Sequence, residues 1–267
     1  LQEEYEKLPK EFLGVRRKET SQGSARHGVI SIEEFYGRLA NRSEDGVIDF
    51  RNAEDAGLFA STDGEVFSDP LGKFTEIRNT LLEGYPEEIW YLKLAEDVAK
   101  ISQTGQYNYK RMLLRKDRLS SDRMLSDAMG HLMRFWHHLH RVYPPHDKWL
   151  KKSLQGLPEG EQFLLTVEKL HASYRQWDDE ALKTVEYLME GLCTSIARVM
   201  YERGIISDID PYLDHHVEEL LMKASYAPLS DEELVEKIAR VEFEAFDKVK
   251  NEGGRAYCQN DWPTLDR

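Results

Sequence analysis

The feature that most constrains the fold is helical periodicity, which continues with few interruptions from Pro86 to about residue 249. Apolar residues recur there at intervals of three and four, as expected for helices that bury one face. A first helix is predicted after Pro86, with Thr104-Gly105 as its stop, and a second over 120–143, ended by Pro144-Pro145. Further helices are predicted around Trp149-Leu150 and over 161–173, 178–203, 210–221 and 230–249.

The first 86 residues have a different sequence pattern, because Gly, Ser and Asp interrupt every apolar run. Short β-leaning runs at 28–32, 46–50 and 64–67 are candidates for edge strands, and a short helix is predicted over 32–39. We therefore expect a mainly α fold, a helical bundle with a small irregular, β-containing N-terminal region. The expected domains are 1–86, the helical bundle 87–229, and a helix and tail, 230–267, that open a second domain.

Charge and cysteine content narrow the function classes. The chain has 49 acidic and 36 basic residues, a formal charge of -13, which disfavours nonspecific binding of nucleic acid or anionic membranes. A local basic cleft could still hold one nucleotide. Two distant cysteines and the absence of any apolar run of about 18 residues predict a cytoplasmic protein without a membrane span.

The densest polar and aromatic cluster lies at 102–111 and is followed by further cations. Tyrosine rings offer stacking faces and guanidinium groups neutralise phosphate, so a nucleotide site is one interpretation. The other is a helix end whose tyrosines fill the core. The candidate binding residues here are Gln103, Tyr107, Asn108, Arg111 and Arg118.

A second candidate is the turn Pro144-Pro145, which places Lys148 beside Trp149. The ammonium group could contact a phosphate and the indole ring could stack on a base. Alternatively, the turn is a rigid corner between helices with Trp149 buried.

Histidines are concentrated on the predicted helix 120–143, namely His131, His137, His138 and His140. Their spacing to other ligand types does not match a zinc site, so packing is the preferred interpretation and no metal site is predicted. Arg134 and His140 loosely fit the Arg-then-His spacing of HEPN-type ribonucleases.

Gly23-Ser24 looks like the turn that opens a nucleotidyltransferase catalytic motif. That motif needs a preceding apolar strand and a following pair of aspartates for two metal ions. Neither is present here, so we interpret this run as an unrelated flexible loop and predict no catalytic residue in the chain.

A series of separate short motifs lies within about residues 8–158. They are Gly64-Glu65-Val66-Phe67, Phe74-Thr75-Glu76-Ile77-Arg78, Tyr85-Pro86, Lys93-Leu94-Ala95, Gln103, Gly105-Gln106-Tyr107-Asn108, Arg111, Arg118, Tyr143-Pro144 and Lys148-Trp149-Leu150. In this order they resemble a bacterial domain family of unknown function, whose members are similar to kanamycin- and lincosamide-type nucleotidyltransferases. The tail from Phe243 to Trp262 resembles the opening of a second uncharacterised bacterial family.

The resemblance implies a helical domain that closes over a nucleotide and its acceptor, a small molecule or a macromolecule. Carried over by position, the binding residues are Gln103, Tyr107, Asn108, Arg111, Arg118, Lys148 and Trp149. The catalytic head is expected to precede Leu1, so this fragment is expected to be inactive alone, whereas the complete protein would use Mg²⁺ and a nucleoside triphosphate. Oligomers are possible. The alternatives are a noncatalytic protein-interaction module and a HEPN-like ribonuclease.

Overall fold

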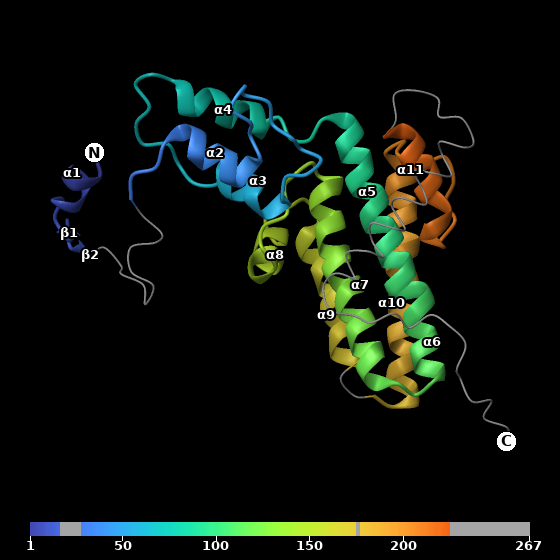
Figure 1. Cartoon of the computed structure of the whole chain (residues 1–267). Coiled ribbons are helices and arrows are strands. Elements are labelled where there is room, and N and C mark those ends of the chain that lie inside the picture. The colour runs from blue at the N-terminus through green and yellow to red at the C-terminus, as the bar shows by residue number, and fades with distance from the viewer. Residues whose placement is uncertain (17–27, 175–176, 225–267) are drawn as a thin grey trace, which may run out of the picture.

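The computed structural model describes residues 1–16, 28–174 and 177–224 and is mainly α, as predicted (Figure 1). Its first unit is a short helix followed by a two-stranded hairpin, and Gln2 joins it to the next described segment by accepting a 2.9 Å hydrogen bond from the Val29 amide. These elements are α1 (Gln2–Glu6), β1 (Glu11–Phe12) and β2 (Val15–Arg16), with the strands antiparallel.

Three short helices form a middle unit beside one end of the bundle (Figure 1). They are α2 (Ile32–Ala40), α3 (Asp55–Thr62) and α4 (Lys73–Leu82), and α3 packs on both of the others. Tyr36, Leu58 and Leu81 are fully buried between them, and the Tyr36 hydroxyl donates a 3.0 Å hydrogen bond to the Phe74 carbonyl.

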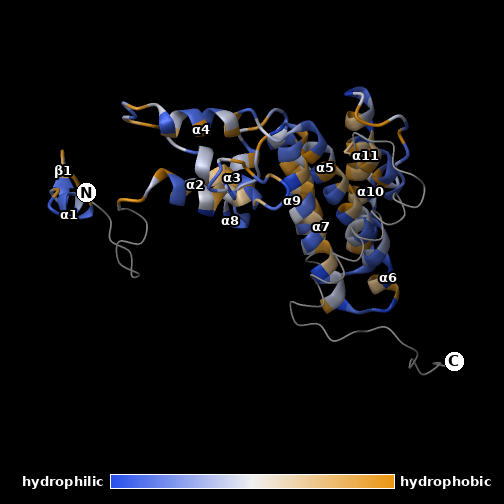
Figure 2. Ribbon diagram, turned by 45° about the horizontal axis from the view of Figure 1, so that its top comes forward, coloured by the Kyte–Doolittle hydropathy of each residue, from blue (hydrophilic) through white to orange (hydrophobic). Residues whose placement is uncertain are grey.

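The bundle contains the long helices. Its elements are α5 (Glu87–Ile101), the π-helix η1 (Ser102–Asn108), α6 (Tyr109–Leu114), α7 (Arg118–Leu139), α8 (Asp147–Leu154), α9 (Gly160–Tyr174), α10 (Asp179–Glu202), the 3-10 turn η2 (Leu213–His216) and α11 (Val217–Lys223). Helix α5 packs against α7 and α11, and α9 packs against α10. Hydrophobic residues run along these long helices (Figure 2), and Leu94, Phe135 and Ile196 are fully buried in the shared core.

Caps set several helix ends as the sequence indicates. Asp178 accepts a hydrogen bond from the Ala181 amide and begins α10, and Gly204, with φ +69°, follows its end. Helix α7 starts slightly earlier than predicted, because Asp117 rather than a serine is its N-cap. It ends at Leu139, before the two prolines.

The predicted stop at Thr104-Gly105 is wrong. The helix continues through η1 directly into α6, so the expected loop around Tyr107 is helical. Gly105 is buried where side chains of Met189 and Ala128 approach its backbone, which gives the glycine a packing role rather than a terminating one. A π-helical turn inside a longer helix accommodates this close contact.

The strands predicted in the first 86 residues are also wrong. Residues 28–32 and 64–67 form no strand, and 46–50 contributes only a single bridge between Arg42 and Ile48. Phe67 is 93% exposed, so the apolar run that suggested a strand has no packing partner. Residues 55–62 and 73–82 instead form the helices α3 and α4. Their sequences are short and interrupted by polar residues, so the local pattern did not predict these helices.

Two predictions lie outside the described residues, namely the Gly23-Ser24 loop and the helix 230–249. Within the described ranges, no helix combines the length and apolar character needed to cross a membrane.

Candidate functional site

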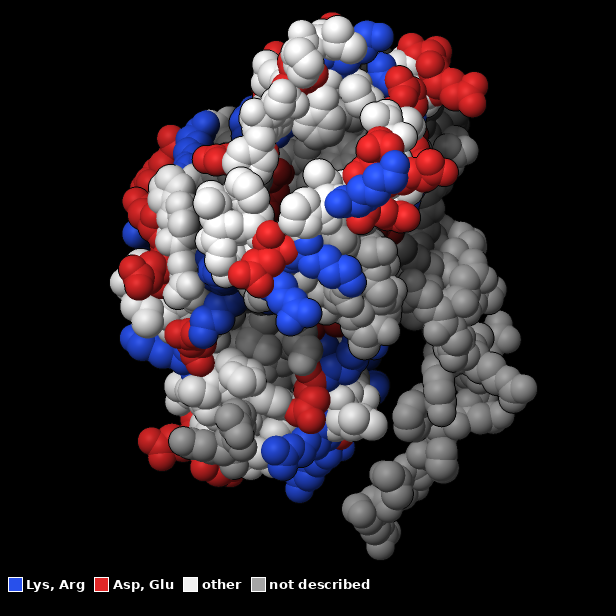
Figure 3. All heavy atoms as spheres, turned by 90° about the vertical axis from the view of Figure 1, so that its left-hand side faces the viewer, with Lys and Arg blue, Asp and Glu red and all other residues white. Residues whose placement is uncertain are grey.

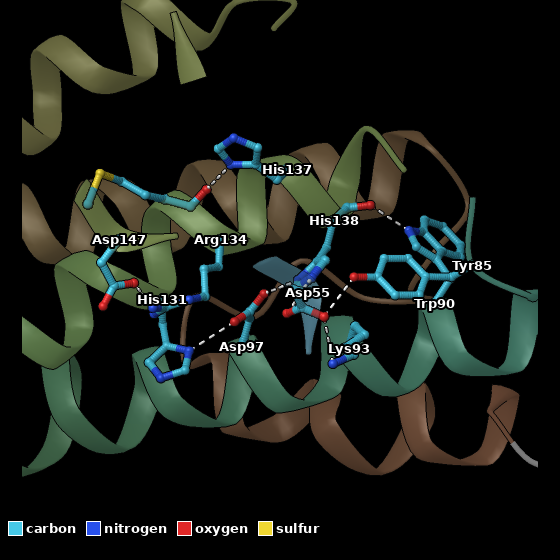
Figure 4. A network of polar contacts seen from close by, with 11 residues as sticks. Asp55, Tyr85, Trp90, Lys93, Asp97, His131, Arg134, His137, His138 and Asp147 are labelled. Carbon is cyan, nitrogen blue, oxygen red and sulfur yellow. Dashed lines mark hydrogen bonds and ion pairs between the residues drawn. The ribbon is translucent and has the colours of Figure 1, made fainter. Parts of the chain in front are cut away.

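A polar cluster lies where the middle unit meets the bundle, between α3, α5 and α7 (Figure 4). We call it the junction cluster, and its residues are Asp55, Lys93, Asp97, His131 and His138. Asp55 is the first residue of α3. The pairs on α5 and α7 are separated by four and seven residues, spacings that place each pair on one helix face. Three distant parts of the sequence thus supply one constellation.

Two carboxylates organise the cluster. Asp97 receives both imidazoles: Nδ1 of His138 lies 2.6 Å from its Oδ2, and Nδ1 of His131 lies 2.9 Å from its Oδ1. Asp55 Oδ1 lies 2.8 Å from Nζ of Lys93 and accepts a 2.7 Å hydrogen bond from the Tyr85 hydroxyl. Each carboxylate therefore has its own basic partner.

His138 is held from several sides. Its backbone carbonyl accepts a 2.6 Å hydrogen bond from Nε1 of Trp90, and the Tyr85 ring packs edge-on with centroids 5.7 Å apart. The guanidinium carbon of Arg141 lies 3.8 Å from the Trp90 ring centroid and covers that indole. These contacts hold the backbone and the ring of His138 in place.

Burial and charge act in opposite directions on the ionisable groups. Burial alone would lower the pKa of His138, but the Asp97 charge, the hydrogen bond to Asp97 and the nearby Asp55 carboxylate raise it to about 9. Burial would raise the pKa of Asp97 and of Asp55, yet contacts with His138 hold both below their usual value. The pKa of Lys93 is raised by Asp55 against the opposing effect of burial. At neutral pH the positive charges of His138 and Lys93 therefore balance the negative charges of Asp97 and Asp55.

The cluster is closed at one end and open at the other. Side chains of His138 and Asp97 are 2% and 3% exposed, whereas Asp55 keeps 19% and His131 keeps 21%. Nε2 of His138 is buried without a hydrogen-bond partner among the described residues. It lies 3.5 Å from Asp55 Oδ2, within ion-pair distance but outside hydrogen-bond geometry.

Lys148 and Trp149 lie in the first turn of α8, directly after Asp147. Arg134, on the face of α7 that carries His131, forms an ion pair with Asp147 at the start of α8 (Figure 4). That pair fixes the first turn of α8, where Lys148 is exposed and Trp149 is 51% exposed. The alternative of a buried Trp149 is therefore wrong.

The other predicted binding residues lie around η1, α6 and the start of α7. Gln103, Tyr107 and Arg111 follow one another at four-residue spacing on an exposed face. Arg111 donates a 2.7 Å hydrogen bond to the Tyr107 hydroxyl, and its guanidinium lies 5.0 Å from that ring centroid. Asn108 is half-buried, and the Arg118 guanidinium lies 5.2 Å from the ring centroid of Trp177.

Arg118 and the turn of Lys148 lie at different levels of α7. Arg118 begins that helix, whereas α8 packs on α7 and α9 and its first turn is joined to Arg134 by Asp147. At 1.5 Å per residue, the 16 residues from Arg118 to Arg134 span roughly 24 Å along the helix. The single hollow expected between Tyr107 and Lys148 stays a prediction.

The remaining histidines pack as the sequence suggested. His137 is fully buried, with Nδ1 2.8 Å from the Met133 carbonyl, and burial lowers its pKa to about 4. His140 contacts Arg203, whereas Arg134 contacts Asp147, so the two residues of the HEPN-like pair interact with different parts of the chain. No group of three or more metal-ligating side chains converges within the described parts of the chain.

Charged side chains of both signs are interspersed on the face shown in Figure 3, without a continuous basic patch there. Sequence reasoning missed the junction cluster because Asp55 comes from a helix that was not predicted. The available signal was the pairing of Lys93 with Asp97 four residues later, and of His131 with His138 two turns later.

Comparison with known proteins places the whole cluster in one matched segment. Residues 50–150 match a family model described as a domain of unknown function (DUF4037), and residues 232–267 match one described as a protein of unknown function (DUF4125). No curated protein and no solved structure gives a significant match. The expected similarity to two uncharacterised families is confirmed, and the likeness to nucleotidyltransferases stays a prediction.

The cluster predicts a specific pH dependence. Because the folded pKa of His138 is raised to about 9, its contribution to stability is fully present below the unfolded pKa of about 6.5 and is lost as pH rises through 9. We expect the free energy of unfolding to fall by up to about 3 kcal/mol over that range. Urea unfolding followed by circular dichroism measures it. The variant His138→Gln should show a flatter profile, and an equally steep profile in that variant would contradict the assignment to His138.

Proposed function

We propose that the helical body is the substrate-recognition part of a nucleotidyltransferase-like protein, which transfers a nucleoside monophosphate to an acceptor when a catalytic head is present. The ion pair between Arg134 and Asp147 carries this proposal, because it joins the start of α8 to the α7 face that holds His131 and His138. In this proposal, the start of α8 forms a rim that binds phosphate, and the junction cluster beyond Arg134 forms the polar region that binds the acceptor.

The rim has the groups that a nucleotide needs. Lys148 is exposed, and Arg134 pairs with the carboxylate of Asp147, whose side chain is 71% exposed, so that phosphate can replace this ion pair at small cost. The Trp149 ring offers a stacking face, with Nζ of Lys152 5.7 Å from its centroid. The nucleotide is thus assigned to Lys148, Trp149 and Arg134.

Mg²⁺ accompanies a nucleoside triphosphate in such reactions, but the described residues do not offer a group of three ligands for it. We therefore assign the ion no protein ligand in this part of the chain. The role given to the helical body is binding and orientation only.

Nucleotide titration tests the assignment. ATP and GTP are titrated into the chain by calorimetry, and Lys148→Ala should weaken binding about tenfold, equivalent to about 1.4 kcal/mol. Arg118→Ala is the matched control, since it removes an exposed cation at the far end of α7 and should leave affinity unchanged. Weaker binding for Arg118→Ala alone would move the site to the η1 end, and no change in either variant would remove the phosphate role.

A further inference from the structure

The unpartnered face of His138 determines which chemical group the junction cluster can accept. At neutral pH the imidazole carries protons on both nitrogens, because its pKa is raised to about 9. Its Nδ1 proton is donated to Asp97, so Nε2 presents a donor that no described residue accepts. A buried donor without a partner costs free energy, so a ligand that accepts from it would be stabilised.

The neighbouring acceptor is equally specific. Oδ1 of Asp55 is engaged by Lys93 and Tyr85, whereas Oδ2 faces Nε2 of His138 at 3.5 Å, within ion-pair distance. Within the described residues the cluster therefore places a donor that makes no hydrogen bond beside a carboxylate oxygen that can accept one. The approach to them passes the Asp55 and Lys93 side chains, which are 19% and 13% exposed.

These two atoms discriminate between ligand classes. A phosphate oxygen could accept from Nε2, but it brings negative charge against Asp55. An ammonium group could donate to Asp55, but it cannot accept from an imidazolium. A hydroxyl group does both, because it has one donor and two acceptor positions.

We propose that the junction cluster is a binding site for an alcohol, with the ligand hydroxyl bridging Nε2 of His138 and Oδ2 of Asp55. Its identification as the acceptor of the transfer rests on the proposed function. In that transfer the hydroxyl oxygen would bond to the α-phosphorus while the bond to pyrophosphate breaks, and its proton would move along the hydrogen bond to Asp55.

The test uses the full chain with ¹⁵N-labelled histidine and follows the His138 Nε2 resonance by NMR. The probes are myo-inositol, putrescine and inorganic phosphate at matched concentrations. We expect a saturable shift with inositol only. A saturable shift with phosphate or putrescine instead, or with none of the three, would overturn the alcohol site.

Two variants separate the site from general destabilisation. Asp55→Asn removes the charged acceptor and should weaken inositol binding roughly fivefold to tenfold, the effect of about one hydrogen bond. Tyr85→Phe removes a hydrogen bond to the other oxygen of the same carboxylate and should leave binding within about twofold. Equal losses in both variants would contradict the bridging geometry.

The nucleotide titration and the inositol test can give negative results independently of each other. Inositol binding without nucleotide binding leaves the alcohol site standing and removes the transferase assignment. Nucleotide binding that depends on Lys148, without an inositol response, removes only the alcohol site.

Discussion

Replacing Asp97 with alanine should lower the free energy of unfolding by about 3–5 kcal/mol, the cost of leaving buried charge uncompensated. The carboxylate is 3% exposed and accepts from two imidazoles, so its removal strands the His138 imidazolium in the core. Compensation by water is restricted because His138 is itself 2% exposed. Urea unfolding at pH 7, followed by circular dichroism, measures the loss.

The control for this prediction is a carboxylate on the surface of the same bundle. Asp127 pairs with Arg123 at 2.9 Å and four-residue spacing, and the arginine side chain is 71% exposed. Asp127→Ala should cost no more than about 1 kcal/mol, because exposed ion pairs contribute little. If Asp97→Ala costs as little as the control, the cluster does not stabilise the junction between α3, α5 and α7.

The second large effect is expected at Gly57, in the middle of α3. A Cβ atom added there would collide with the backbone carbonyl oxygen of Leu39 in α2, and backbone cannot move aside as a flexible side chain can. Gly57→Ala should therefore destabilise the protein by about 1–3 kcal/mol, as overpacking does in well-packed cores. It should also shift the His138 resonance, since α3 carries Asp55.

Gly191 in α10 is the matched control, because it is also a helical glycine but has open space around it. Gly191→Ala should stabilise the protein by about 0.5–1 kcal/mol through the lower entropy of the unfolded chain. Thermal unfolding of both variants gives the comparison. Stabilisation by both substitutions would show that α2 and α3 do not approach as closely as the structure indicates.

The sequence alone determined the mainly α class and most helices of the bundle. The reason is local: Asp178, Gly204 and the apolar stripes act through neighbours within a few residues, so their effect is visible in the sequence. Even there, Gly105 was misinterpreted, because its role depends on Met189, which lies on another helix.

Tertiary structure decided the middle unit and the site. Helix α3 has an interior glycine and no side-chain N-cap, so only its packing on α2 and α4 explains it. Asp55, Asp97 and His138 are far apart in sequence, and their pKa values are shifted because folding brings their opposite charges into contact. In the same way, the ion pair between Arg134 and Asp147 depends on the face of α7 on which α8 packs, which local patterns do not specify.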